Sequence, residues 1–222
     1  MPRIYCSTLP IPGPIPACSA FTFALPTGKD DVYPGEMPAF IDARTGHILT
    51  RTAIRHLALR LAYGLTMCLH LKRGDIVLLF SPNSLAFPIG VYGSTAAGLR
   101  VSLANAAYTA PELLHQFKDS GASYIFVHPT LIPIAMSMFS LGGYTSQEAR
   151  SKCIILDYNN LSGVPVPEGC LTLEELLGAG TREVEELYER EEADETAFLC
   201  YSSGTTGRAK GVMVRHLSVL SH

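Results

Sequence analysis

Hydrophobic positions change their spacing repeatedly along the chain, and these changes predict alternating helices and strands. Apolar residues recur at intervals of three and four over 51–70, which predicts an amphipathic helix. The all-apolar run Ile-Val-Leu-Leu-Phe at 76–80 is typical of a strand that is buried on both faces. By the same reasoning, we predict further strands at 101–104, 123–127, 152–156, 197–201 and 211–215. The predicted helices that separate them are 84–98, 109–121, 130–140 and 172–178.

This alternation predicts an α/β fold, a layered and mostly parallel sheet with crossover helices. Two local signals support the helix positions. Thr109 and Glu112 have the spacing of a capping box, which opens a helix that ends near Gly121. Pro88 is tolerated only if it lies in the first turn of its helix, because proline cannot donate a backbone hydrogen bond. No interior domain boundary is evident over 35–222.

The polar segments outside these elements are predicted to lie on the surface. Residues 1–34 are interpreted as an extended arm and linker, since prolines at 10, 12, 14 and 16 would break the apolar helix of a signal peptide. Residues 183–195 carry eight acidic side chains, which predicts a solvated face rather than a metal site. The tripeptide Arg73-Gly74-Asp75 is predicted to be a turn that leads into a buried strand.

Composition narrows the class of protein. The 222 residues are 47% hydrophobic and 17% charged, which is a globular composition. The net charge of −3 and the lack of a basic block argue against a nucleic-acid partner. No apolar run is long enough to cross a bilayer. The six cysteines form no CxxC pair, which favours reduced thiols in a reducing compartment.

The stretch YSSGTTGRAKG at 201–211 carries the candidate chemistry. Glycines allow the backbone to approach a ligand closely, and successive backbone N–H groups can form an anion-binding concavity. Hydroxyls add neutral donors, and Lys210 adds one cation. A polyphosphate needs this combination. The candidate phosphate-binding residues are Ser202, Ser203, Gly204, Thr205, Thr206, Gly207 and Lys210.

Two other interpretations of this stretch fit the sequence less well. A Walker A loop requires G-x-x-x-x-G-K-[ST] at the start of a helix, whereas Lys210 follows Gly207 by three and a strand comes next. An ordinary Gly- and Ser-rich turn between two strands would not account for a match that extends over twelve residues. His216, which follows the last predicted strand, is interpreted as structural rather than catalytic.

The run LCYSSGTTGRAK at 199–210 resembles the phosphate-binding signature of the adenylate-forming enzymes, with Ala209 where most relatives have proline. LKRGDIVLLFSPNS at 71–84, the segment 96–122 and DETAFLCYSSGTTG at 194–207 resemble other parts of the same family, in the family's order. Residues 35–222 thus look like the first part of the family's N-terminal domain. Among the branches, the chain is most similar to the 4-coumarate–CoA ligase-like acyl-CoA synthetases.

The resemblance implies a two-step reaction in which a carboxylic acid is adenylated by Mg²⁺-bound ATP and then transferred to coenzyme A. It implies that the seven candidate residues hold the ATP phosphates. In the family, the adenine and ribose pocket, the acyl pocket and the adenylation lysine come later in the chain. We therefore expect 222 residues alone to be inactive and to expose apolar surface. The alternative is a non-catalytic remnant or nucleotide-phosphate-binding module.

The remaining expectations concern the context of the protein. Without a secretion signal, the resemblance implies a cytoplasmic or peroxisomal location. A homo-oligomer is compatible with the sequence, which leaves the oligomeric state, the carboxylic acid and the thiol acceptor open.

Overall fold

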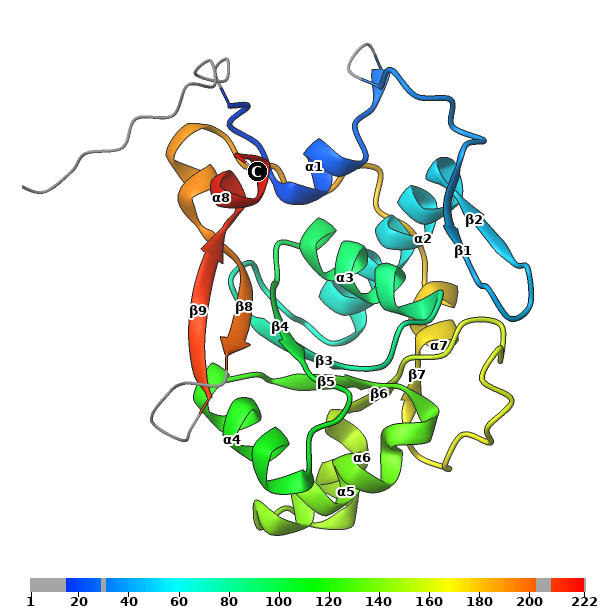
Figure 1. Cartoon of the computed structure of the whole chain (residues 1–222), viewed down its shortest axis with the longest axis vertical. Helices are drawn as coiled ribbons and strands as arrows, with labels where there is room; N and C mark the ends of the chain where they lie inside the picture. The colour runs from blue at the N-terminus through cyan, green and yellow to red at the C-terminus, as the bar shows by residue number, and fades with distance from the viewer. Residues whose placement is uncertain (1–14, 29–30, 203–208, 222) are drawn as a thin grey trace, which may run out of the picture.

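A seven-stranded sheet forms the centre of the protein, with helices on both of its faces (Figure 1). The computed structural model describes residues 15–28, 31–202 and 209–221. The strand order is β7-β6-β5-β3-β4-β8-β9, and every pairing is parallel except that of β8 with β9. The strands are β3 (Ile76–Phe80), β4 (Arg100–Ala104), β5 (Tyr124–Val127), β6 (Cys153–Ile155), β7 (Leu171–Thr172), β8 (Thr196–Ser202) and β9 (Lys210–Arg215). The predicted α/β class is confirmed.

Strand β3 shows why its sequence is continuously apolar. Val77 and Leu79 belong to a core cluster on one face of the sheet, together with residues of α2 (Arg51–Tyr63), α3 (Ala86–Ala96) and α7 (Leu173–Gly178). Leu78 and Phe80 belong to the cluster on the other face, with residues of α4 (Ala110–Ser120), α5 (Ile132–Leu141) and α6 (Ser146–Lys152). Successive side chains of a strand point to opposite faces, so both helical layers require apolar residues.

The predicted helices are confirmed with shifted ends. The helix predicted over 51–70 is α-helical only to Tyr63 and continues as a π-helical segment, η2 (Gly64–Cys68). Pro88 is the third residue of α3, inside its first turn as required. The helix predicted at 130–140 begins with the 3-10 turn η3 (Pro129–Leu131) and continues as α5. Helix α6, strand β7 and the terminal helix α8 (His216–Leu220) were not predicted.

Part of the arm and linker expected over 1–34 is helical. Ala20–Ala24 form a short helix, α1, whose N-cap Ser19 accepts a hydrogen bond from the Thr22 backbone at 2.9 Å. Phe21 of this helix is completely buried and packs edge-on against Tyr92 of α3. A hairpin of β1 (Pro38–Ile41) and β2 (Ile48–Thr50) follows. One buried aromatic ring thus fixes this segment to the core, against the expectation from its proline-rich start.

The acidic segment 183–195, which ends in the 3-10 turn η4 (Arg190–Asp194), is only partly the solvated face that we predicted. Glu185 is 6% exposed, and its carboxylate lies 2.6 Å from the Arg55 guanidinium of α2. Arg73 forms ion pairs with three other carboxylates of the segment and stacks on Tyr188, with its guanidinium carbon 4.0 Å from the ring centroid. Arg55 of α2 and Arg73 of the turn before β3 therefore offset the mutual repulsion of these carboxylates.

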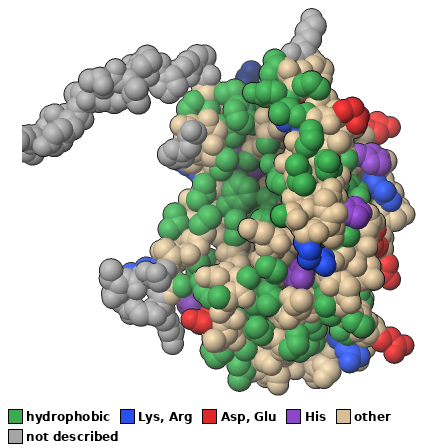
Figure 2. Space-filling view, turned by 45° about the vertical axis from the view of Figure 1, so that its right-hand side comes forward, with side chains coloured by type: hydrophobic (Ala, Val, Ile, Leu, Met, Phe, Trp, Pro, Cys, Tyr) green, Lys and Arg blue, Asp and Glu red, His purple; other side chains and the backbone are tan. Residues whose placement is uncertain are grey.

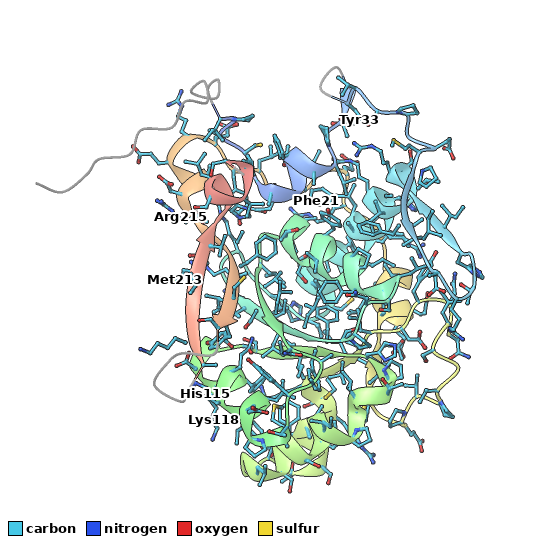
Figure 3. All side chains as sticks on the ribbon, in the orientation of Figure 1. Phe21, Tyr33, His115, Lys118, Met213 and Arg215 are labelled. Carbon is cyan, nitrogen blue, oxygen red and sulfur yellow. The ribbon has the colours of Figure 1, made fainter. Side chains whose placement is uncertain are left out.

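Apolar side chains remain exposed on part of the surface, as we expected. Val212 and Met213 of the outer strand β9 are more than half exposed. Met213 lies at this outer edge of the sheet in Figure 3. Hydrophobic side chains also gather across the middle of the face drawn in Figure 2, whereas charged side chains lie mainly along its right-hand margin. Among the described residues, no helix is both long enough and apolar enough to span a membrane.

Candidate functional site

The candidate phosphate loop lies between the antiparallel strands β8 and β9. Ser202 and Lys210 are the last cross-strand pair of this ladder, and both residues are exposed. Directly opposed residues of an antiparallel pair share one face of the sheet, with Cβ atoms about 5 Å apart. The predicted residues Ser203, Gly204, Thr205, Thr206 and Gly207 lie outside the described residues. The strand register therefore places Ser202 opposite Lys210 where the loop begins and ends.

The position of the loop in the sheet is typical of a ligand site. Strand β8 runs parallel to β4, with Leu103 opposite Cys200, so the loop follows the carboxyl end of a strand in the parallel sheet. Ligands of open α/β sheets bind outside the carboxyl ends of the strands. Strand β9 then returns antiparallel to the sheet edge. The signature thus forms a hairpin connection, which differs from the strand-to-helix connection of a Walker A loop.

Helix α4 contacts the residues on either side of the loop, Tyr201 and Ala209. On the incoming arm, the Tyr201 hydroxyl donates a hydrogen bond to Asp119 Oδ2 at 2.6 Å. Burial raises the pKa of Tyr201 well above its usual range, and the bond to Asp119 raises it further, so the phenol stays a donor at neutral pH. On the outgoing arm, His115 Nε2 lies 3.0 Å from the carbonyl oxygen of Ala209, the residue before Lys210. These contacts were not foreseen from the sequence.

Helix α4 is itself fixed to the sheet. The Gln116 amide donates to Ser102 Oγ at 2.9 Å and to the Leu103 carbonyl at 3.1 Å, both on β4. The predicted capping box is present, with the Thr109 backbone N–H donating to Glu112 Oε2 at 2.8 Å. Hydrogen bonds from Thr109 hold the pKa of Glu112 below its usual range. The helix that touches the loop is therefore rigidly tied to the strand beside β8.

His216 and the Arg-Gly-Asp tripeptide, which the sequence analysis also considered, contribute to the fold and not to the loop. His216 is 1% exposed, and its Nδ1 accepts a hydrogen bond from the Ala20 backbone at 3.0 Å, which agrees with a structural role. Burial lowers the pKa of His216 to about 4. Gly74 of the Arg-Gly-Asp tripeptide has φ of 86° and lies two residues before the start of β3 at Ile76, as expected for a turn. No group of three metal-ligating side chains occurs in the part of the chain that the structure describes.

The family described as AMP-binding enzyme matches residues 29–222, and the chain belongs to it. The match covers both the described sheet and the signature loop.

Curated relatives carry the names of CoA ligases. The chain is 34% identical over 187 residues to 4-coumarate–CoA ligase-like 8 of Arabidopsis thaliana, covering 83% of the chain and 32% of the relative. It is 29% identical over 221 residues to peroxisomal OPC-8:0-CoA ligase 1 of the same plant, covering 98% of the chain and 36% of the relative. A long-chain-fatty-acid–CoA ligase of Salmonella typhimurium is 30% identical over 202 residues, covering 84% and 35%. The chain thus spans about a third of the length of these relatives.

Solved structures share the fold. A benzoate CoA ligase from Burkholderia xenovorans superimposes with a TM-score of 0.68 at 18% identity, covering 89% of this chain and 34% of that one. An anthranilate CoA ligase in complex with anthranoyl-AMP gives 0.73 at 19% identity, covering 92% and 36%. These neighbours establish that the described sheet has the architecture found in such ligases.

Proposed function

We propose that this chain supplies the ATP-phosphate-binding part of an AMP-forming acid–thiol ligase of the 4-coumarate–CoA ligase-like kind. The observation that carries the proposal is the end of the β8–β9 hairpin. It sets Ser202 beside Lys210 and joins them through the Ser-, Thr- and Gly-rich stretch, at the carboxyl edge of the sheet. Membership of the AMP-binding family and relatives named as CoA ligases support it.

The proposed role of these residues is to bind the phosphates that leave. In adenylation, an oxygen of the substrate carboxylate attacks the α-phosphorus of ATP, and the bond from that phosphorus to the β-phosphate oxygen breaks. Negative charge develops on the departing pyrophosphate. The Lys210 ammonium and the hydroxyl and backbone donors of 202–207 stabilise this charge. The described residues offer no cluster that would hold Mg²⁺, so we assign no metal ligand and no step to the ion.

Substrates are proposed by class. The acceptor in the second step is the thiol of coenzyme A, in line with the names of the relatives, and the first substrate is a carboxylic acid. A cytoplasmic or peroxisomal location is proposed, supported by the peroxisomal name of one relative. Expression of a fluorescent fusion with organelle markers tests the location, and labelling of any other compartment would refute it.

The alternative is a phosphate-binding module without catalysis. The 222 residues match only about a third of each relative, which favours this reading for the chain when it is assayed alone. The two readings share the phosphate site and differ in chemistry. Binding and turnover must therefore be measured separately.

The decisive experiment combines these two measurements on the purified chain. Isothermal titration with pyrophosphate and ATP tests the phosphate site, and ATP–pyrophosphate exchange with a panel of carboxylic acids tests catalysis. We expect binding without exchange. Exchange would assign catalysis to the chain itself, whereas failure to bind either phosphate compound would refute the proposed site.

A further inference from the structure

We propose that helix α4 positions the phosphate loop, with His115 and Asp119 as positioning residues that hold its two arms. The inference gives a role to side chains that the signature does not include. Its functional meaning rests on the proposed phosphate site, but the contacts themselves are independent of it. His115 and Asp119 are four residues apart, so they lie one above the other on the same face of the helix.

The contacts are made at matching places on the two arms. Asp119 accepts from Tyr201, which is one residue before Ser202, at 2.6 Å. His115 lies 3.0 Å from the carbonyl of Ala209, which is one residue before Lys210. In the neutral form with its proton on Nε2, and equally in the protonated form, the imidazole donates to this carbonyl. One turn of helix therefore controls the backbone that carries both described candidate residues.

The helix can serve as a brace because it cannot easily move. Leu113 and Phe117 are buried in the core cluster on its face of the sheet. Gln116, which lies between the two positioning residues, is 1% exposed and is bonded to two atoms of β4. The contact side chains thus belong to a helix that shares the rigid frame of the sheet. Holding Tyr201 and Ala209 in such a frame preorganises the neighbouring Ser202 and Lys210, which lowers the entropy that these two residues lose when they bind phosphate.

The test uses substitutions that remove each contact and restore one of them. His115→Ala removes the bond to Ala209, and His115→Gln restores an amide donor at that place. Tyr201→Phe removes only the hydroxyl that donates to Asp119. His47→Gln and Tyr144→Phe are the matched controls. The exposed His47 ring lies within hydrogen-bond distance of Thr45 in the β1–β2 hairpin, and the Tyr144 ring packs against Phe139.

Two measurements distinguish the positioning role of α4 from the proposed phosphate-binding function. The first is the rate of tryptic cleavage after Arg208, followed by mass spectrometry on the folded protein without any ligand. The second is the affinity for pyrophosphate. We expect His115→Ala and Tyr201→Phe to increase the cleavage rate and to weaken pyrophosphate binding about three- to tenfold, as befits one lost hydrogen bond. His115→Gln should return both values toward those of the wild type, while thermal melting changes little.

The outcomes test the positioning role of α4 and the proposed phosphate binding independently. Cleavage rates that are equal in the wild type, His115→Ala and Tyr201→Phe would overturn the brace, whatever the protein binds. A wild type that does not bind pyrophosphate refutes the proposed function, and the cleavage assay still judges the brace. If His115→Gln behaves like His115→Ala, while both controls match the wild type, the donor role of His115 is refuted.

Discussion

Tyr201 and Gly211 face each other across β8 and β9, and the aromatic ring occupies the space that a side chain at Gly211 would need. A Cβ atom on Gly211 would lie 3.0 Å from Tyr201 Cζ and 3.2 Å from its hydroxyl oxygen. That hydroxyl is the group that donates to Asp119. Glycine at 211, directly after Lys210, thus leaves room for the close approach of the Tyr201 ring.

Substitution of this glycine should disturb the loop through the tyrosine. Gly211→Ala pushes the end of the Tyr201 ring and strains its bond to Asp119, so pyrophosphate affinity should fall about three- to tenfold. Calorimetric titration measures the loss. Because both changes act on one contact, Tyr201→Phe combined with Gly211→Ala should cost less than the sum of the single variants. Gly178→Ala, where a Cβ would meet nothing within 4 Å, is the control.

Lys210 should contribute to binding and not to stability. Lys210 is the exposed first residue of β9, so its side chain adds little to the folded state. Lys210→Ala should weaken pyrophosphate binding by roughly ten- to hundredfold, the range for a hydrogen bond to a charged group. Its melting temperature should stay near that of the wild type. Lys72→Ala removes another exposed cation, which precedes the amino end of β3 and so lies away from the carboxyl edge that carries the loop, and this change should leave binding unchanged. Equal affinities for the two variants would exclude Lys210 from the phosphate site.

Folding stability should fall in mild acid because of His216. Its folded pKa of about 4 lies below the ordinary value of 6.5, so the unfolded chain binds more protons between these pH values. Stability is therefore full above pH 6.5 and decreases as the pH falls toward 4. The loss between pH 7.5 and 5 should be about 2 kcal/mol.

Urea unfolding at the two pH values measures this loss. His216→Gln should flatten the pH dependence of the unfolding free energy, because glutamine does not titrate. It should also lower stability at pH 7.5, because the amide oxygen can replace Nδ1 only approximately as acceptor for the Ala20 N–H. The exposed His47→Gln variant should keep the wild-type profile. A profile for His216→Gln as steep as the wild type's would assign the acid sensitivity to other groups.

The ion pair between Glu185 and Arg55 should be important for stability. Glu185→Ala leaves the largely buried guanidinium without its carboxylate and also removes the acceptor of Thr22 Oγ1, which lies at 3.2 Å. Loss of one partner of a buried pair costs about 3–5 kcal/mol, and the partial exposure of Arg55 places this pair at the lower end. Chemical denaturation measures the change. Glu191→Ala, an exposed residue of the same acidic run, should change stability by less than about 0.5 kcal/mol.

The sequence by itself determined the local elements and part of the site. Short apolar runs identified β3, β4, β5, β6, β8 and β9. In β3, β5 and β6 the run is apolar throughout because successive side chains enter the core clusters on both faces of the sheet. The Thr109–Glu112 spacing located the start of α4, since capping depends on atoms three residues apart. The signature selected Ser202 and Lys210, which the strand register brings together, whereas its five central residues lie outside the described ranges.

Only the tertiary structure decided which distant residues meet. Asp119 and Tyr201 are 82 positions apart, and Ala20 and His216 are 196 apart, so neither contact leaves a periodic trace in the sequence. The same holds for Phe21, whose burial against α3 turns an expected surface arm into part of the core. Periodicity reports whether a position is buried, but the partner that buries it depends on strand order and helix packing, which are properties of the whole fold.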